Sequence, residues 1–132
     1  MSGQLETNVV LRRPLSITII GWLFIFTGIG GMLLHAKEIN PRALLESDLL
    51  VAASLRLLAI VGGIFLLRGA DWARWLLMVW TAFHVVLSIR HPLPELITHC
   101  VIMIVIAVVL YLPSSSAFIL ASKAQKSIPA QP

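Results

Sequence analysis

The chain has 132 residues, of which 58% are hydrophobic and 12% are charged. About a quarter of the residues of a soluble domain are charged, because its surface faces water. The composition therefore excludes an ordinary soluble domain and predicts a single membrane domain over residues 1–132. The net charge of +4 comes from basic residues that lie singly or in one pair beside apolar runs, which argues against a nucleic-acid partner.

Four apolar runs of about the length that a membrane-spanning helix needs follow one another along the chain. The predicted transmembrane helices are 15–34, 49–67, 72–89 and 96–112. The first run is too long for the apolar part of a signal peptide, so we expect it to remain in the protein. The fourth run lacks the alternation of polar and apolar residues that a barrel strand requires. We therefore predict helices throughout.

The breaks between the runs carry residues that end and begin helices. Asn40-Pro41 suits the start of the second helix, and Gly69 followed by Asp71 suits a tight turn between the second and third. Pro92 and Pro94 separate the third and fourth helices. We predict an all-α, polytopic membrane protein, an antiparallel up-down four-helix bundle with a short interfacial helix in the C-terminal tail, 113–132.

The basic residues favour an orientation with both termini in the cytoplasm, which places segments 1–13 and 113–132 there. Six of the ten lie on the side of the termini and four on the other side. The six are Arg12, Arg13, Arg68, Arg74, Lys123 and Lys126, and the four are Lys37, Arg42, Arg56 and Arg90.

Small residues of the first two spans predict a closely packed hairpin, because helices in lipid associate where small residues let their backbones approach. The glycines expected at this contact are Gly21, Gly28, Gly31, Gly62 and Gly63. The alternative is that glycine is simply frequent in membrane helices.

Polar residues inside the predicted spans gather at one depth, in the third of the bilayer farthest from the termini. Arg56, His84 and His99 come from three different spans. The residues that we expect to line a polar pocket there are Arg56, Thr81, His84, Ser88, Glu95 and His99. Buried ionisable groups in a membrane are costly, so such a group is a candidate site.

Several interpretations of this cluster stay open. Arg56 could bind the acidic group of a small ligand or of a lipid headgroup, with Glu95 as its partner in the empty site. His84 and His99 could instead be ligands of a haem or a metal. A proton-coupled carrier would normally need a carboxylate inside a span, which these runs lack. The simplest alternative is structural, with Arg56 reaching the interface and each imidazole tying helices together.

Two segments resemble small bacterial four-span membrane proteins of uncharacterised function. They are Arg13-Pro14 leading into Ile17-Thr18-Ile19-Ile20-Gly21-Trp22-Leu23, and Leu67-Arg68-Gly69-Ala70-Asp71-Trp72-Ala73-Arg74-Trp75. The resemblance implies a four-helix fold in the bacterial cytoplasmic membrane and supplies no active residues.

No catalytic motif is present in the sequence, so we expect a protein that is not an enzyme and that needs no cofactor. We expect a structural, assembly or regulatory subunit that associates with itself or with another membrane protein. The alternative is a ligand-binding or carrier protein that uses the polar pocket.

Overall fold

The computed structural model describes residues 12–35 and 47–127, and within these ranges the chain is helical with no strand. Its helices are α1 (Leu15–His35), α2 (Ser47–Leu67), α3 (Asp71–Ser88), α4 (Leu93–Tyr111) and α5 (Pro113–Ser127). The break predicted at Asn40-Pro41 lies outside the described residues. The all-α prediction is therefore confirmed for the described part of the chain.

Three of the described helices, rather than four, are long and apolar enough to cross a membrane, judged by length and composition. They are α1 over Leu15–Leu34, α2 over Leu49–Leu67 and α4 over Leu93–Tyr111, with mean hydropathies of 2.1, 2.3 and 2.4. The remaining predicted span, 72–89, corresponds to α3, which has 18 residues and carries Asp71 and Arg74 in its first turn. These charges explain why α3 is less apolar than the other three.

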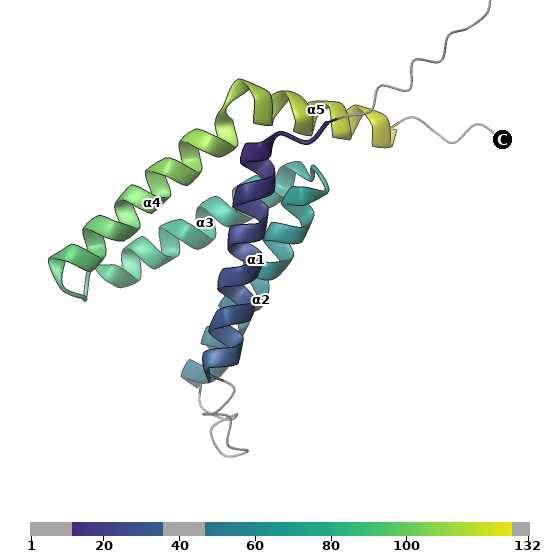
Figure 1. Cartoon of the computed structure of the whole chain (residues 1–132). Helices are drawn as coiled ribbons and strands as arrows, with labels where there is room; N and C mark the ends of the chain where they lie inside the picture. Colours follow the sequence, from purple (N-terminus) through teal and green to yellow (C-terminus); the bar gives the residue numbers. More distant parts are fainter. Residues whose placement is uncertain (1–11, 36–46, 128–132) are drawn as a thin grey trace, which may run out of the picture.

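Helices α1 and α2 pack side by side as an antiparallel pair through glycines (Figure 1). A Cβ atom added to Gly63 would lie 2.6 Å from the carbonyl oxygen of Gly21, so neither position has room for a side chain. Gly28 meets the backbone of α2 in the same way, because its added Cβ would lie 2.8 Å from the carbonyl oxygen of Arg56. The backbones of α1 and α2 are thus in direct contact at two levels.

Gly62 faces a different neighbour from Gly63. Its added Cβ would lie 2.6 Å from a methyl carbon of Leu77, on α3. Leu77 is fully buried in the core, together with Ile17 of α1 and Leu110 of α4. Consecutive glycines on α2 therefore serve two contacts, Gly63 with α1 and Gly62 with α3.

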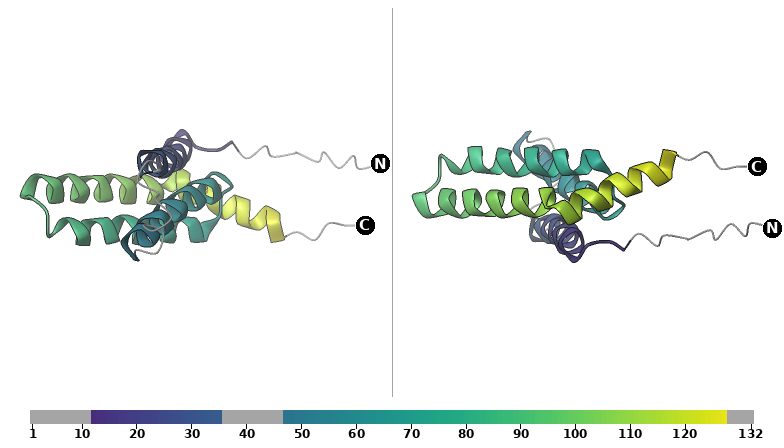
Figure 2. Two further views of the ribbon diagram at one scale, coloured as in Figure 1. Left: turned by 90° about the horizontal axis from the view of Figure 1, so that it is seen from below. Right: turned by 90° about the horizontal axis from the view of Figure 1, so that it is seen from above.

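Helices α3 and α4 form a second antiparallel pair, which runs away from the first at an angle (Figures 1 and 2). The two pairs meet where α1 and α3 begin and where α2 and α4 end. We call this the basic end, because Arg12, Arg13, Arg68 and Arg74 lie there. The opposite, open end contains the turn between α3 and α4, which lies apart from the far ends of α1 and α2. The up-down order of the helices is present, but the pairs diverge.

The turn between α2 and α3 is made by a glycine in the left-handed region. Gly69 has a φ of +70°, the only positive φ among the described residues, and the turn is closed by the Ala70 N–H, which donates to the carbonyl oxygen of Phe65 at 3.0 Å. A Cβ at Gly69 would also lie 2.7 Å from that of Ser122 on α5. Glycine is thus required here for both conformation and space.

Helix α5 begins directly after α4 and extends across the basic end (Figure 1). The short helix expected in the C-terminal tail is therefore present, and it begins at Pro113, so that the three serines after this proline are helical. The fully buried Ser115 donates to the carbonyl oxygen of Val109 at 2.8 Å, which satisfies an acceptor near the end of α4, and its hydroxyl lies 3.1 Å from that of Ser16 on α1.

Arg74 ties α3 to α5 at the same end. Its guanidinium pairs with Asp71, donates to the Ser116 hydroxyl at 3.3 Å and lies over the Tyr111 ring. At the far end of α5, the Lys126 ammonium donates to the carbonyl oxygen of Arg68 at 3.2 Å. The basic end is therefore closed by polar contacts from four helices.

Candidate functional site

A cavity of about 360 Å³ lies where the two helix pairs begin to diverge. Its volume is within the range of about 300 to 1,000 Å³ that is typical of small-ligand sites. Four helices contribute to its wall. The lining residues are Leu23, Phe24, Thr27, Gly28 and Gly31 from α1, Arg56 from α2, Trp80, Thr81 and His84 from α3, and His99, Ile102 and Ile106 from α4.

Of the six residues that the sequence places in a polar pocket, Arg56, Thr81, His84 and His99 line this cavity. They come from three helices. The two helix pairs meet at the basic end and diverge from there (Figure 1), and residues of both pairs line the cavity.

Arg56 reaches the cavity across the surface of α1. A Cβ atom added to Gly31 would lie 2.7 Å from the Nε atom of Arg56, so the side chain of Arg56 occupies the space that a larger residue on α1 would fill. Arg56 is itself only partly exposed. The role of Gly31 is thus to accommodate the guanidinium group, in addition to its place in the α1–α2 contact.

Trp80 forms part of the wall between α2 and α3. Its indole N–H donates to the carbonyl oxygen of Leu55 at 2.7 Å, and its ring packs edge to face against Phe24 of α1 with centroids 5.3 Å apart. One side chain of α3 therefore fixes the distance to both helices of the first pair. No sequence pattern singles out Trp80, because aromatic residues are common inside apolar runs.

His84 lies one turn beyond Trp80 and stacks on its ring, with centroids 3.9 Å apart. The Nδ1 atom of His84 lies 2.9 Å from the carbonyl oxygen of Trp80. A carbonyl oxygen only accepts hydrogen bonds, so Nδ1 carries the proton and donates. The neutral imidazole then presents Nε2 as an acceptor.

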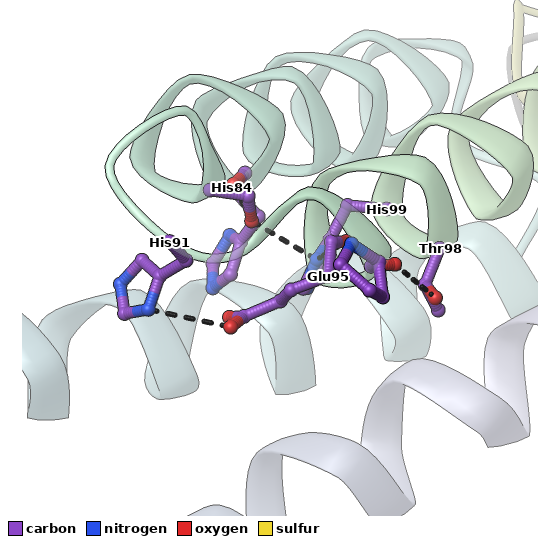
Figure 3. A network of polar contacts seen from close by, with 7 residues as sticks. His84, His91, Glu95, Thr98 and His99 are labelled. Carbon is purple, nitrogen blue, oxygen red and sulfur yellow. Dashed lines mark hydrogen bonds and ion pairs between the residues drawn. The ribbon is translucent and has the colours of Figure 1, made fainter.

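His99 on α4 has the same arrangement. Its Nδ1 lies 2.9 Å from the carbonyl oxygen of Glu95 and 3.0 Å from the hydroxyl of Ser88 (Figure 3). The Ser88 hydroxyl donates to the carbonyl oxygen of His84 at 2.9 Å, so it accepts from His99. Ser88 is 3% exposed and lies behind the cavity wall, where it joins α3 to α4.

Glu95 lies away from the cavity. Its carboxylate is 3.3 Å from Nδ1 of His91, and both side chains are largely exposed at the turn between α3 and α4 (Figure 3). The cavity therefore holds a guanidinium group, and no carboxylate is among its lining residues.

A metal or a haem would have to rely on the two imidazoles. The ring centroids of His84 and His99 are 6.5 Å apart. The described residues contain no group of three or more His, Cys, Asp or Glu side chains that could hold a metal ion. A third side-chain ligand is thus missing from this part of the chain, and the nearby guanidinium is unfavourable to a bound cation.

Comparisons of the chain with protein-family models, with curated proteins and with solved structures give no match. The case for a function therefore depends on the residues of the cavity.

Proposed function

We propose that this chain is a four-span protein of the bacterial cytoplasmic membrane, with both termini inside, that binds a small acidic amphiphile in the cavity between its helix pairs. The observation that carries the proposal is the composition of the cavity wall. Among the described residues that form this wall, a guanidinium group and two imidazoles meet, none is a carboxylate, and most of the others are apolar.

The chemistry of the wall matches the two parts of such a ligand. A guanidinium group binds carboxylates and phosphates through parallel hydrogen bonds. Leu23, Ile102 and Ile106 offer an apolar surface to an alkyl chain. A wholly polar ligand would leave this apolar surface without a matching contact, and a wholly apolar one would make no use of the N–H donors of Arg56.

The proposal that α3 is the fourth span has physical support despite its lower hydropathy. Its 18 residues extend about 27 Å, close to the roughly 30 Å of the hydrocarbon core. Its charges, Asp71 and Arg74, are at the basic end and pair with each other. Helix α3 packs against α2, which precedes it in the chain, and against α4, which follows it, so it would cross the bilayer in the direction opposite to both.

Trp80 provides a direct test, because it lines the cavity. The variant Trp22→Phe/Trp72→Phe/Trp75→Phe leaves it as the one tryptophan. In lipid discs made of phosphatidylcholine, dibromostearate should quench its fluorescence with a saturable dependence on concentration, because bromine quenches at contact. Dibromostearate methyl ester, which has no charge, should quench at least tenfold more weakly at equal concentration.

Arg56→Gln should remove the saturable quenching. The matched control is Arg90→Gln, since Arg90 is an exposed arginine at the open end that does not line the cavity. Gly31→Ala should weaken the binding several-fold, because its methyl group would displace the Arg56 side chain. Equal quenching by the acid and its ester, unchanged in Arg56→Gln, would contradict the proposed function.

A second candidate, an assembly or regulatory subunit, has its own supporting observation on α4. Only 11% of the residues in the most apolar stretch of α4 are buried, compared with 33% in that of α1. A partner helix or a second copy could cover this surface, as could lipid. A protein that copurifies as a defined complex, with binding of the acid unaffected by Arg56→Gln, would favour this candidate over the first.

A further inference from the structure

The two histidines of the cavity share a feature that narrows the ligand class. Each Nδ1 atom lies 2.9 Å from the carbonyl oxygen four residues earlier on its own helix, Trp80 for His84 and Glu95 for His99. Each Nδ1 must therefore donate. Both rings are held in the tautomer that has its free electron pair on Nε2.

The Nε2 atoms of both histidines are exposed. Neither Nε2 of His84 nor that of His99 forms a hydrogen bond to the residues that the structure describes. Among these residues, no buried side-chain nitrogen or oxygen atom lacks a hydrogen-bond partner, so neither Nε2 atom is buried. Because both side chains line the cavity, their Nε2 atoms are accessible acceptors. The polar part of the wall thus combines a donor, Arg56, with two acceptors.

We propose that the polar end of the ligand carries hydroxyl groups beside its anionic group, as a glycerol phosphodiester does. This inference rests on the proposed function. The phosphodiester accepts from Arg56, and the hydroxyls donate to Nε2 of His84 and His99. A simple carboxylate or an alkyl phosphodiester accepts from Arg56 but offers no hydrogen-bond donor to either imidazole.

Other headgroups fit this wall less well. A choline group has no N–H or O–H to donate. An ammonium group donates but brings a positive charge next to Arg56. A metal ion would use the same electron pairs, but it faces the same positive charge and finds only two imidazole ligands. An anion with hydroxyl groups satisfies both kinds of residue.

Two matched amphiphiles test the inference: dodecyl phosphoglycerol and the methyl ester of dodecyl phosphate. Each has one negative charge and a twelve-carbon chain, and only the first has free hydroxyls. Their affinities are measured by competition with dibromostearate for the Trp80 site in phosphatidylcholine discs at pH 8. The glycerol ester should bind about three- to tenfold more tightly, as expected for one or two hydrogen bonds.

His84→Phe should reduce this preference to within about twofold and leave the affinity for the methyl ester unchanged, because phenylalanine retains the ring stacked on Trp80. His91→Phe is the matched control, since His91 is an exposed imidazole at the same end that does not line the cavity. It should keep the full preference. If the His84 variant does not fold, His99→Phe provides the same comparison.

A water-soluble probe separates a lipid-like ligand from a free metabolite. Methyl phosphoglycerol, a phosphodiester with one negative charge and two free hydroxyls, has the same polar groups without the long chain and should fail to compete at millimolar concentration. Competition as strong as that of dodecyl phosphoglycerol would overturn the assignment to an amphiphile.

The possible failures are distinguishable. Equal affinities for the two esters, both lost in Arg56→Gln, would overturn the hydroxyl inference and leave the proposed function standing. No displacement by either ester, together with quenching that is independent of Arg56, would overturn both.

Discussion

In the α1–α2 pair, backbone meets backbone at glycines, whereas the far part of the α3–α4 pair is joined through side chains. Gly21 and Gly63 leave no space between α1 and α2. Ser88 and His99 instead bridge α3 and α4 by a hydrogen bond of 3.0 Å. The first kind of contact is rigid because it has no side-chain rotamers, and the second can be rearranged.

This difference explains where the cavity lies. The glycine contact holds α1 and α2 as a rigid pair, and α3 diverges from it after Trp80, whose indole still reaches the carbonyl oxygen of Leu55. Beyond this residue no glycine brings the pairs together, and polar side chains line the space instead. Three substitutions test the comparison. The first is in the rigid α1–α2 pair, the second is at Trp80, which we call the joint, and the third is in the turn between α3 and α4, which we call the tip.

The largest effect is expected at the rigid pair. Gly63→Leu should lower the free energy of unfolding by at least about 3 kcal/mol, because any side chain at this position would overlap the carbonyl oxygen of Gly21. The measurement is reversible unfolding in mixed detergent micelles. Gly30→Leu is the control, since no atom lies within 4 Å of a Cβ placed there. It should change the stability by less than about 0.5 kcal/mol. Similar values for both variants would contradict a glycine-dependent contact.

A smaller effect is expected at the joint. Trp80→Phe removes the hydrogen bond to the carbonyl oxygen of Leu55 and keeps an aromatic ring, so it should cost about 1 kcal/mol in the same assay. Trp22→Phe is the control, because Trp22 is about half exposed and stacks on Phe26 of its own helix. An effect of Trp80→Phe no greater than that of Trp22→Phe would show that the indole does not hold α3 against α2.

The smallest effect is expected at the tip. Glu95→Gln breaks the contact with His91, but both side chains are more than 40% exposed. Solvent screens such a pair, so the stability should change by less than about 0.5 kcal/mol. A loss of more than about 2 kcal/mol would mean that the turn between α3 and α4 depends on the contact between Glu95 and His91.

Much of the fold follows from local patterns in the sequence. The apolar runs 15–34 and 49–67 lie within α1 and α2, because length and hydropathy are properties of a continuous segment. Gly69 marks the turn between α2 and α3 through its own conformational freedom. The helix expected in the C-terminal tail is present as α5, but its start directly after α4 was not predicted, because Ser115 and Ser116 are stabilised there by bonds to distant residues.

The candidate site could be predicted only in part. Depth along each span brings Arg56, His84 and His99 to one level, and these three line the cavity. Depth alone does not give the rotation of a helix or the angle between pairs. For that reason the sequence predicts Glu95 in the pocket, whereas its side chain is exposed beside His91, and the sequence indicates no role for Trp80.

Photolabelling tests the central claim most directly, because it reports where the ligand lies. A dodecyl phosphoglycerol with a diazirine in its chain is activated in lipid discs, and the labelled residues are found by mass spectrometry. The proposal predicts label on residues that line the cavity, such as Leu23 and Ile106, and loss of that label in Arg56→Gln. Label confined to exposed residues of α4, such as Val101 and Ile104, and equal in both proteins would contradict it.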